Sequence, residues 1–220
     1  MNLNRFEGVI PPNLGNCKNL LVLDLCCNYL TGTIPKQVID LSSLSIYLDM
    51  SNNFLVGALP FEVGTLKNLA ELDLSDNRLS GKILTTLETC LSLERQYLEG
   101  NSFEGETPQS LETIRSLDEI DLSRNKLSGH IPEFLSKFLL LKLLNLCYND
   151  FEGEVPSEGI FANASKISIF GNDKLCGGVQ ELHLPTCSRK NLHSSRTLLA
   201  LKVVIPVTSI VIFVLVLLYL

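Results

Sequence analysis

The chain has 220 residues, of which 45% are hydrophobic and 19% are charged, and its formal net charge is −6. Four basic residues follow the last acid, so residues 1–188 carry 14 basic and 24 acidic side chains, a net charge of −10. This acidic body excludes nucleic acid as a partner, because phosphate binding needs clustered lysine and arginine.

The most regular feature of the sequence is a repeat of 24 residues. An asparagine recurs in register, with a single step of 25 residues, and a glycine follows it by four residues in every copy. A proline follows it by seven residues in every copy but one, where Leu84 stands. The asparagines are Asn4, Asn28, Asn53, Asn77, Asn101, Asn125 and Asn149.

Apolar residues keep the same register within each repeat. They stand five and three residues before the asparagine, as Leu72 and Leu74 do, and this spacing of two places them on one face of a short strand. They return two, six and ten residues after it, as in Leu79, Ile83 and Leu87. One coil cannot bury these side chains alone, so we expect stacked coils that share a continuous core.

The conserved spacing of asparagine, glycine and proline has a mechanical reason. A chain that turns sharply after a strand leaves backbone groups unpaired, and an inward asparagine amide can both donate to them and accept from them. Glycine permits backbone angles that a Cβ forbids, and proline fixes the chain as it leaves the turn. We therefore predict a ladder of asparagine side chains inside the solenoid.

The stretches SDNRLSGKI and SRNKLSGHIPEFL resemble the plant-type leucine-rich repeat, LxxLxLSxNxLxGxIPxxLxxL, and the likeness covers roughly residues 4–160. The resemblance implies an α/β fold: a leucine-rich-repeat solenoid with a parallel β-sheet on its concave face and short 3-10 or irregular segments on its convex face. Gln96 replaces a core leucine, Thr107 replaces an isoleucine, and the copy LSSLSIYLDM carries one extra residue. We expect local irregularity at these three places.

We divide the chain into four parts. Residues 1–160 hold about seven repeats, the first of them partial, and residues 161–188 form a C-terminal cap, because a last coil without one would expose its core. Residues 189–202 form a basic juxtamembrane linker, and residues 203–220 form a transmembrane helix.

The predicted transmembrane helix, VVIPVTSIVIFVLVLLYL, contains no charged residue. At 1.5 Å per residue it spans about 27 Å, enough to cross the core of a bilayer, and Pro206 is tolerated in such a helix. The basic residues before it would place that side in the cytoplasm, whereas the resemblance places the repeats outside. Because the chain starts without a secretory signal peptide, we expect both of its ends to be incomplete.

The segment FGNDKLCGGVQELHLPTC resembles the C-terminal cap of plant leucine-rich-repeat receptor kinases, in which FxGNxxLCGG precedes a second cysteine. The resemblance implies a disulfide between Cys176 and Cys187, as suits an oxidising compartment. Two free thiols are one alternative. A zinc site with His183 or His193 is another, disfavoured because the chain has no CxxC pair.

The five other cysteines have different expected roles. Cys17 and Cys90 stand 13 residues after an asparagine, where other copies have core residues. Cys26 and Cys147 share a position usually held by serine, but they stand five coils apart, about 24 Å at the spacing of neighbouring strands and beyond disulfide reach. Cys27 is expected to be an exposed thiol.

A single N-glycosylation triplet, Asn163-Ala164-Ser165, lies in the predicted cap. We expect it at an exposed edge of a secreted segment, where Asn163 would carry a glycan.

The solvent-facing side of the predicted sheet is where we expect a ligand. The residues six, four, two and one before each asparagine face solvent there, and most of them are acidic or polar. Arg95, Tyr97 and Arg124 interrupt this strip, and arginine and aromatic side chains dominate binding hot spots. An ordinary solvated face is the alternative. The candidate ligand-binding residues are Tyr47, Asp49, Glu71, Asp73, Arg95, Tyr97, Glu99, Glu119, Asp121 and Arg124.

The sequence predicts a binding protein and not an enzyme. Its three histidines are expected on a turn, in the cap and in the linker, and no nucleophile, base and orienting group converge. No kinase motif is present, and we predict no cofactor and no metal site.

The resemblance implies the extracellular ligand-recognition module of a receptor-like kinase, without its kinase. It would be a single-pass protein of the plasma membrane that binds a peptide or protein ligand and a leucine-rich-repeat co-receptor, in immune or developmental signalling. The alternative is a kinase-less receptor-like protein or decoy, or an inhibitor-type repeat protein that binds a pathogen enzyme.

Overall fold

A computed structural model describes residues 2 and 4–187 of the chain. Every helix and strand named below belongs to the compact unit that ends at Thr186. The described residues contain no helix that is both long and apolar enough to cross a membrane. The transmembrane helix predicted over 203–220, and the linker predicted over 189–202, lie outside the described residues.

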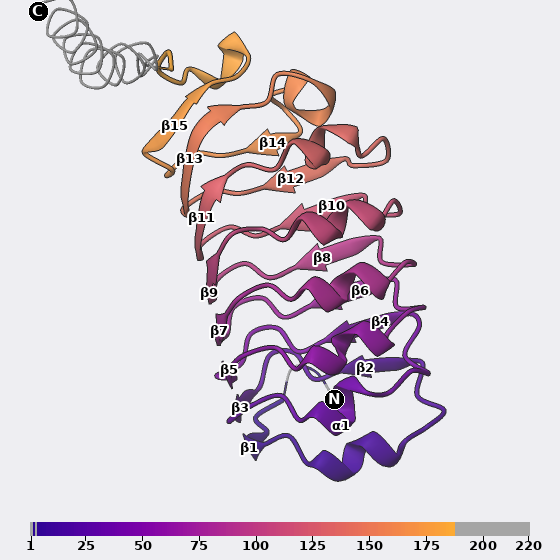
Figure 1. The fold of residues 1–220 in the computed structure, drawn as a ribbon. Coiled ribbons are helices and arrows are strands. Elements are labelled where there is room, and N and C mark those ends of the chain that lie inside the picture. The colour runs from indigo at the N-terminus through magenta and orange to yellow at the C-terminus, as the bar shows by residue number, and fades with distance from the viewer. Residues whose placement is uncertain (1, 3, 188–220) are drawn as a thin grey trace, which may run out of the picture. The chain divides into compact units, whose positions relative to one another are not determined.

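The strands that precede the asparagines build a seven-stranded parallel sheet in the order β14-β12-β10-β8-β6-β4-β2 (Figure 1). Equivalent positions of the repeat stand side by side in it: Glu71 pairs with Tyr47 on one side and with Arg95 on the other. The predicted leucine-rich-repeat solenoid is thus confirmed. The strands are β2 (Val22–Asp24), β4 (Tyr47–Asp49), β6 (Glu71–Asp73), β8 (Arg95–Tyr97), β10 (Glu119–Asp121), β12 (Leu143–Asn145) and β14 (Ile167–Ser168).

A second set of strands follows the asparagines. They form a six-stranded parallel sheet, β15-β13-β11-β9-β7-β5, and a two-stranded sheet, β1-β3. These strands were not predicted from the sequence, because a single apolar residue followed by a glycine is typical of a turn. The strands are β1 (Glu7–Val9), β3 (Tyr29–Thr31), β5 (Val56–Gly57), β7 (Arg78–Gly81), β9 (Ser102–Gly105), β11 (Lys126–His130), β13 (Asp150–Val155) and β15 (Lys174–Gly177).

Short helices complete the coils, and most are of the 3-10 type. A proline in extended conformation precedes most of them, and Leu84 takes the same conformation before η3 (φ −79, ψ 139), which explains why the missing proline is tolerated. The helices are η1 (Pro12–Asn16), α1 (Lys36–Ile39), η2 (Phe61–Thr65), η3 (Thr85–Thr89), η4 (Gln109–Thr113), η5 (Glu133–Lys137), η6 (Gly159–Ala162) and η7 (Gln180–Leu182).

From Asn28 to Asn149 the asparagine side chains form the predicted ladder beside a leucine-rich core. The prediction was wrong for Asn4, which is exposed and whose Nδ2 donates to the carbonyl of Asn2. Asn77 is typical: its Oδ1 accepts from the backbone N–H of Leu55 in the preceding coil at 3.0 Å, and its Nδ2 donates to the carbonyl of Met50 at 2.9 Å. The ladder continues into the cap, where Asn172 accepts from Phe151 N–H at 3.1 Å. The repeat pattern had not predicted Asn172 as a rung, because its spacing from Asn149 is 23 residues.

The three irregular places keep the fold. Gln96 is buried within β8, yet β8 pairs in register with both neighbouring strands. The extra residue is absorbed just before β4, where Ser45 and Ile46 both donate their N–H to the carbonyl of Leu21. Disturbance at Gln96 and Thr107 is therefore confined to hydrogen bonding, since the side-chain Nε2 of Gln96 and Oγ1 of Thr107 are buried without a partner.

The cysteines differ in part from expectation. Cys176 and Cys187 are both disulfide-bonded, whereas Cys26, Cys27, Cys147 and the remaining two are free. Cys90 is buried as expected. The prediction of a core position was wrong for Cys17, which is exposed because no described coil covers that side of the first repeat.

Candidate ligand-binding surface

The solvent-facing side of the seven-stranded sheet, between β4 and β10, carries the predicted ligand-binding residues; we call it the sheet surface. Register places Tyr47, Glu71, Arg95 and Glu119 in one row across four strands. A second row runs parallel to it through Asp49, Asp73, Tyr97 and Asp121. Glu99 and Arg124 lie beyond the ends of β8 and β10. All ten predicted residues therefore belong to one continuous surface.

The cationic and aromatic residues of this surface are bonded to acids on neighbouring strands. Arg95 Nε lies 2.6 Å from Glu71 Oε2, and this bond raises the pKa of the guanidinium. The hydroxyl of Tyr97 donates to Glu119 Oε2. Burial, and then this bond, raise the pKa of the phenol. Arg95 and Tyr97 are thus held in place by strands on opposite sides of β8.

The aspartates of the second row also hold the turn that follows each strand. Asp49 Oδ1 accepts from the backbone N–H of Ser51 at 2.9 Å and from its hydroxyl at 2.7 Å. Asp73 makes the same two bonds with Ser75. Burial raises the pKa of Asp73, although the bonds with Ser75 oppose this. These two candidates serve the repeat itself, whatever they contribute to a ligand.

The expectation that residues two before the asparagine face solvent was wrong. Ser51, Ser75 and Ser123 are each at most 5% exposed, and Cys147 at the equivalent position is 3% exposed. Their small side chains turn inward at the end of the strand. Glu99 and Cys26 occupy the same position in their coils but are only partly buried.

Glu99 is consequently in an unusual setting for a carboxylate. Its Oε2 is shielded from solvent and has no hydrogen-bond partner. Burial raises its pKa to about 7, and the charges of Asp121, Asp73 and Asp76 add to the effect.

Unsatisfied polar groups gather in the coil that contains Asn101. Within residues 2 and 4–187, five buried side-chain atoms lack a hydrogen-bond partner, and three of them belong to Gln96, Glu99 and Thr107. An unpaired buried polar group costs about 1–3 kcal/mol. This coil therefore departs from the repeat at some cost in stability.

One group of side chains has atoms close enough to hold a metal ion. Asp24, Cys26 and Asp49 bring three such atoms within 4.8 Å of one another. Asp24 Oδ1, however, already accepts from the N–H of Cys26 at 3.1 Å, as the equivalent aspartates do in other coils. The arrangement is the turn of the repeat with cysteine in place of serine, and we assign it no metal.

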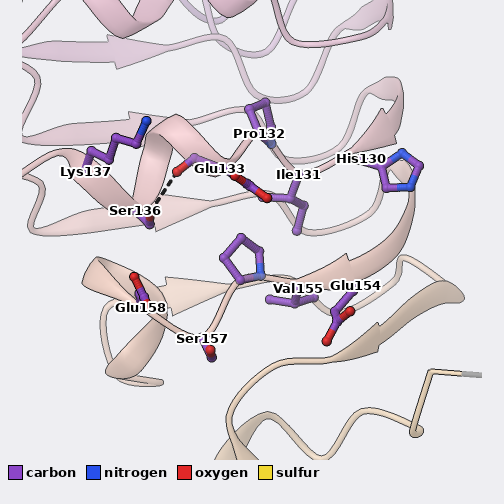
Figure 2. A pocket seen from close by; sticks show the side chains of 11 residues that line it. His130, Ile131, Pro132, Glu133, Ser136, Lys137, Glu154, Val155, Ser157 and Glu158 are labelled. Carbon is purple, nitrogen blue, oxygen red and sulfur yellow. Dashed lines mark hydrogen bonds between the residues drawn. The ribbon is translucent and has the colours of Figure 1, made fainter.

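A groove of about 840 Å³ lies away from the sheet surface, between the coils of η5 and η6. Figure 2 shows His130 and Glu154 at one end and Lys137 and Glu158 at the other. The repeat pattern did not predict this groove, because a groove between coils depends on how η6 packs against η5. Its lining mixes both charges with apolar side chains, and nothing in it indicates a ligand.

The predicted glycosylation site lies on the surface of the cap. Asn163 is exposed at the C-terminal end of η6, and its Oδ1 accepts from the N–H of Ser165 at 3.0 Å and from the hydroxyl of Ser165 at 2.7 Å. Solvent reaches the side chain that a glycan would modify.

Comparison with known proteins agrees with this architecture. The family described as Leucine Rich Repeat matches residues 19–43, 68–90 and 116–138. A crystal structure of PEPR1–AtPEP1 matches with a TM-score of 0.69 and 29% identity, over 79% of this chain and 28% of that chain. The chain is a leucine-rich-repeat protein related to the ectodomains of plant receptor kinases.

Two further relatives of this leucine-rich-repeat protein support the same conclusion. The Arabidopsis receptor kinase HAESA, in complex with the peptide hormone IDA and the co-receptor SERK1, matches with a TM-score of 0.59 and 29% identity, over 79% of this chain and 37% of that chain. The receptor kinase-like protein Xa21 of Oryza sativa subsp. japonica is 69% identical over 29 residues, which are 13% of this chain and 3% of that protein. The chain thus spans well under half the length of these relatives.

Proposed function

We propose that this leucine-rich-repeat chain is the extracellular ligand-recognition part of a receptor-like kinase, and that it binds an extended peptide or a peptide-like segment of a protein on the sheet surface. The membrane anchor of this proposal is the apolar segment 203–220, and the proposed activity is binding and not catalysis. The observation that carries the proposal is that Arg95, bonded to Glu71, and Tyr97, bonded to Glu119, present a cation and an aromatic ring within an acidic surface.

The geometry of the sheet surface favours an elongated ligand. Equivalent residues repeat at each strand, about 4.8 Å apart, so a peptide that crosses the strands meets a new pair of side chains at every step. The ion pair of Arg95 with Glu71 is partly exposed, with side-chain exposures of 38% and 26%. Such pairs contribute about 0–1 kcal/mol, so a ligand can exchange one of these partners for its own group at little cost.

The ligands named with two relatives support a peptide as the chemical class of the ligand. PEPR1 is named in complex with AtPEP1, and HAESA with the peptide hormone IDA and the co-receptor SERK1. By analogy we propose a peptide ligand for this chain and a leucine-rich-repeat co-receptor as a second partner. The acidic residues around Arg95 favour a peptide with basic residues.

The test is selection of a phage-displayed random peptide library on the 220-residue chain in detergent, followed by calorimetric measurement of Kd. We expect enriched peptides whose affinity falls at least tenfold in Arg95→Ala and Tyr97→Ala. Lys82→Ala, an exposed change beyond the end of β7, is the control and should leave Kd unchanged. Failure to enrich any peptide, or equal Kd values in all variants, would rule the proposal out.

A further inference from the structure

Glu99 stands where the repeat otherwise places a small, buried side chain. In the neighbouring coils the residue two before the asparagine is Ser75 or Ser123, at 4% and 5% exposure. Compared with serine, a glutamate adds one methylene group and replaces the hydroxyl with a charged carboxylate. The side chain of Glu99 is only partly buried, but one of its carboxylate oxygens, Oε2, is shielded from water without a hydrogen-bond partner.

Acids face Glu99 from the strands on both sides. Asp73 and Asp76 belong to the coil of β6, and Asp121 belongs to the coil of β10. The nearby cations are already engaged, since Arg124 is paired with Asp76 and Arg95 with Glu71. Tyr97, the remaining titratable residue of β8, donates its hydroxyl to Glu119.

We propose that Glu99 is a proton-sensitive switch in the sheet surface. At mildly acidic pH its carboxyl group is protonated, and above neutral pH it carries a negative charge that is repelled by Asp73, Asp76 and Asp121. Burial, followed by these like charges, raises its pKa to about 7 from a usual value of 4.5. A carboxyl whose two neighbouring strands offer only acids or occupied cations gains from holding a proton.

The sign of the pH effect follows from proton linkage. Because the pKa of Glu99 is higher in the folded chain than in the unfolded chain, the folded chain binds the proton more tightly. The resulting stabilisation is complete below about pH 4.5 and is lost as pH rises to about 7. Over the same interval the centre of the sheet surface gains one negative charge. If the proposed peptide function holds, a basic ligand group would bind there more tightly above neutrality.

The test needs no ligand, so its failure is separate from a failure of the proposed function. Thermal unfolding of the 220-residue chain is followed from pH 5 to pH 8 in the wild type, in Glu99→Gln and in Glu99→Ser, which restores the residue of the neighbouring coils. We expect the Tm of both variants to rise relative to wild type by at least about 2 °C between pH 5 and pH 8. Glu104→Gln, an exposed change on β9, should track the wild type at every pH. Parallel curves for wild type and Glu99→Gln would overturn the proposal.

A second measurement covers the case in which the variants do not fold. Carboxyl-carbon NMR of wild-type protein follows the titration of Glu99, assigned through its backbone connectivity. A midpoint within a unit of pH 7 supports the switch, and a midpoint near 4.5 overturns it.

Discussion

Arg124 Nη2 lies 3.0 Å from Asp76 Oδ1, although the two residues are 48 positions apart and belong to coils that are not neighbours. The coil between them places Gly100 at the equivalent position, and a Cβ there would lie 2.2 Å from Asp76 Oδ1. The ion pair can therefore cross one coil only because that coil has no side chain at this point.

Replacement of this glycine should release the ion pair. In Gly100→Ala the backbone angle of φ +65 costs about 1–2 kcal/mol, and displacement of the Asp76 carboxylate adds up to about 1 kcal/mol. Urea denaturation measures the loss. In an Arg124→Ala background the same change should cost less, because Asp76 is then free to move. Additive costs in the double variant would show that Gly100 does not support the pair.

The asparagine ladder should carry a large share of stability at every rung. Asn77→Ala leaves the N–H of Leu55 without a partner, and an unpaired buried group costs about 1–3 kcal/mol. It also removes one of the two donors to the carbonyl of Met50, which keeps its bond from Asn53 Nδ2. We expect a fall of at least about 1 kcal/mol in the free energy of unfolding, measured by urea denaturation. The exposed Asn68→Ala is the matched control and should change it by less than about 0.5 kcal/mol. Similar values for the two variants would contradict the ladder.

A polar core residue offers a stabilising change. Gln96 is 1% exposed, and its Nε2 has no hydrogen-bond partner. The other coils have leucine or isoleucine at this position, such as the equally buried Leu72. Gln96→Leu should raise the free energy of unfolding by about 1–3 kcal/mol, because it removes an unpaired polar group and fills the core. Leu72→Gln, the reverse change one coil earlier, should lower it. A destabilised Gln96→Leu would mean that the amide has a partner in solution.

The cap offers a test of exposure and export. Expressed in eukaryotic cells with an added secretion signal, the chain should carry a glycan at Asn163, visible as a mass decrease after treatment with peptide-N-glycosidase. Ser165→Ala removes the hydroxyl that bonds Asn163 Oδ1 and should abolish the modification. An unmodified wild-type chain that nevertheless reaches the cell surface would refute the assignment.

The fold could be predicted from the sequence wherever a side chain acts through its repeat position. Asn77 and Leu72 occupy the ladder and the core, as the equivalent positions do in the other described coils from Asn28 onward. The second set of strands, such as β7, could not be predicted. These strands form through backbone pairing between neighbouring coils, which leaves little trace in the pattern of side chains. Cys17 was misplaced because its burial depends on a neighbouring coil and not on its own position.

The candidate site was predictable as a surface but not as a set of contacts. Alternation along β8 and β10 predicted that Arg95 and Glu119 face the same side. It could not predict which acid each donor would choose, since Arg95 turns to one neighbouring strand and Tyr97 to the other. Glu99 was predicted to be exposed. Its partial burial follows from the inward turn of the backbone at the end of each strand, which the alternation of side chains does not reveal.

The extra residue at Ser45 and Ile46 shows how this architecture can change its size. It is taken up before β4, and the bonds of Asn53 to the preceding coil keep the form that they have elsewhere. Every coil joins the next through the same few backbone partners, so the junction does not depend on which coil stands where. Gene duplication or unequal crossing-over can therefore add or remove whole coils, and the coils on either side of the change can still form these bonds with each other.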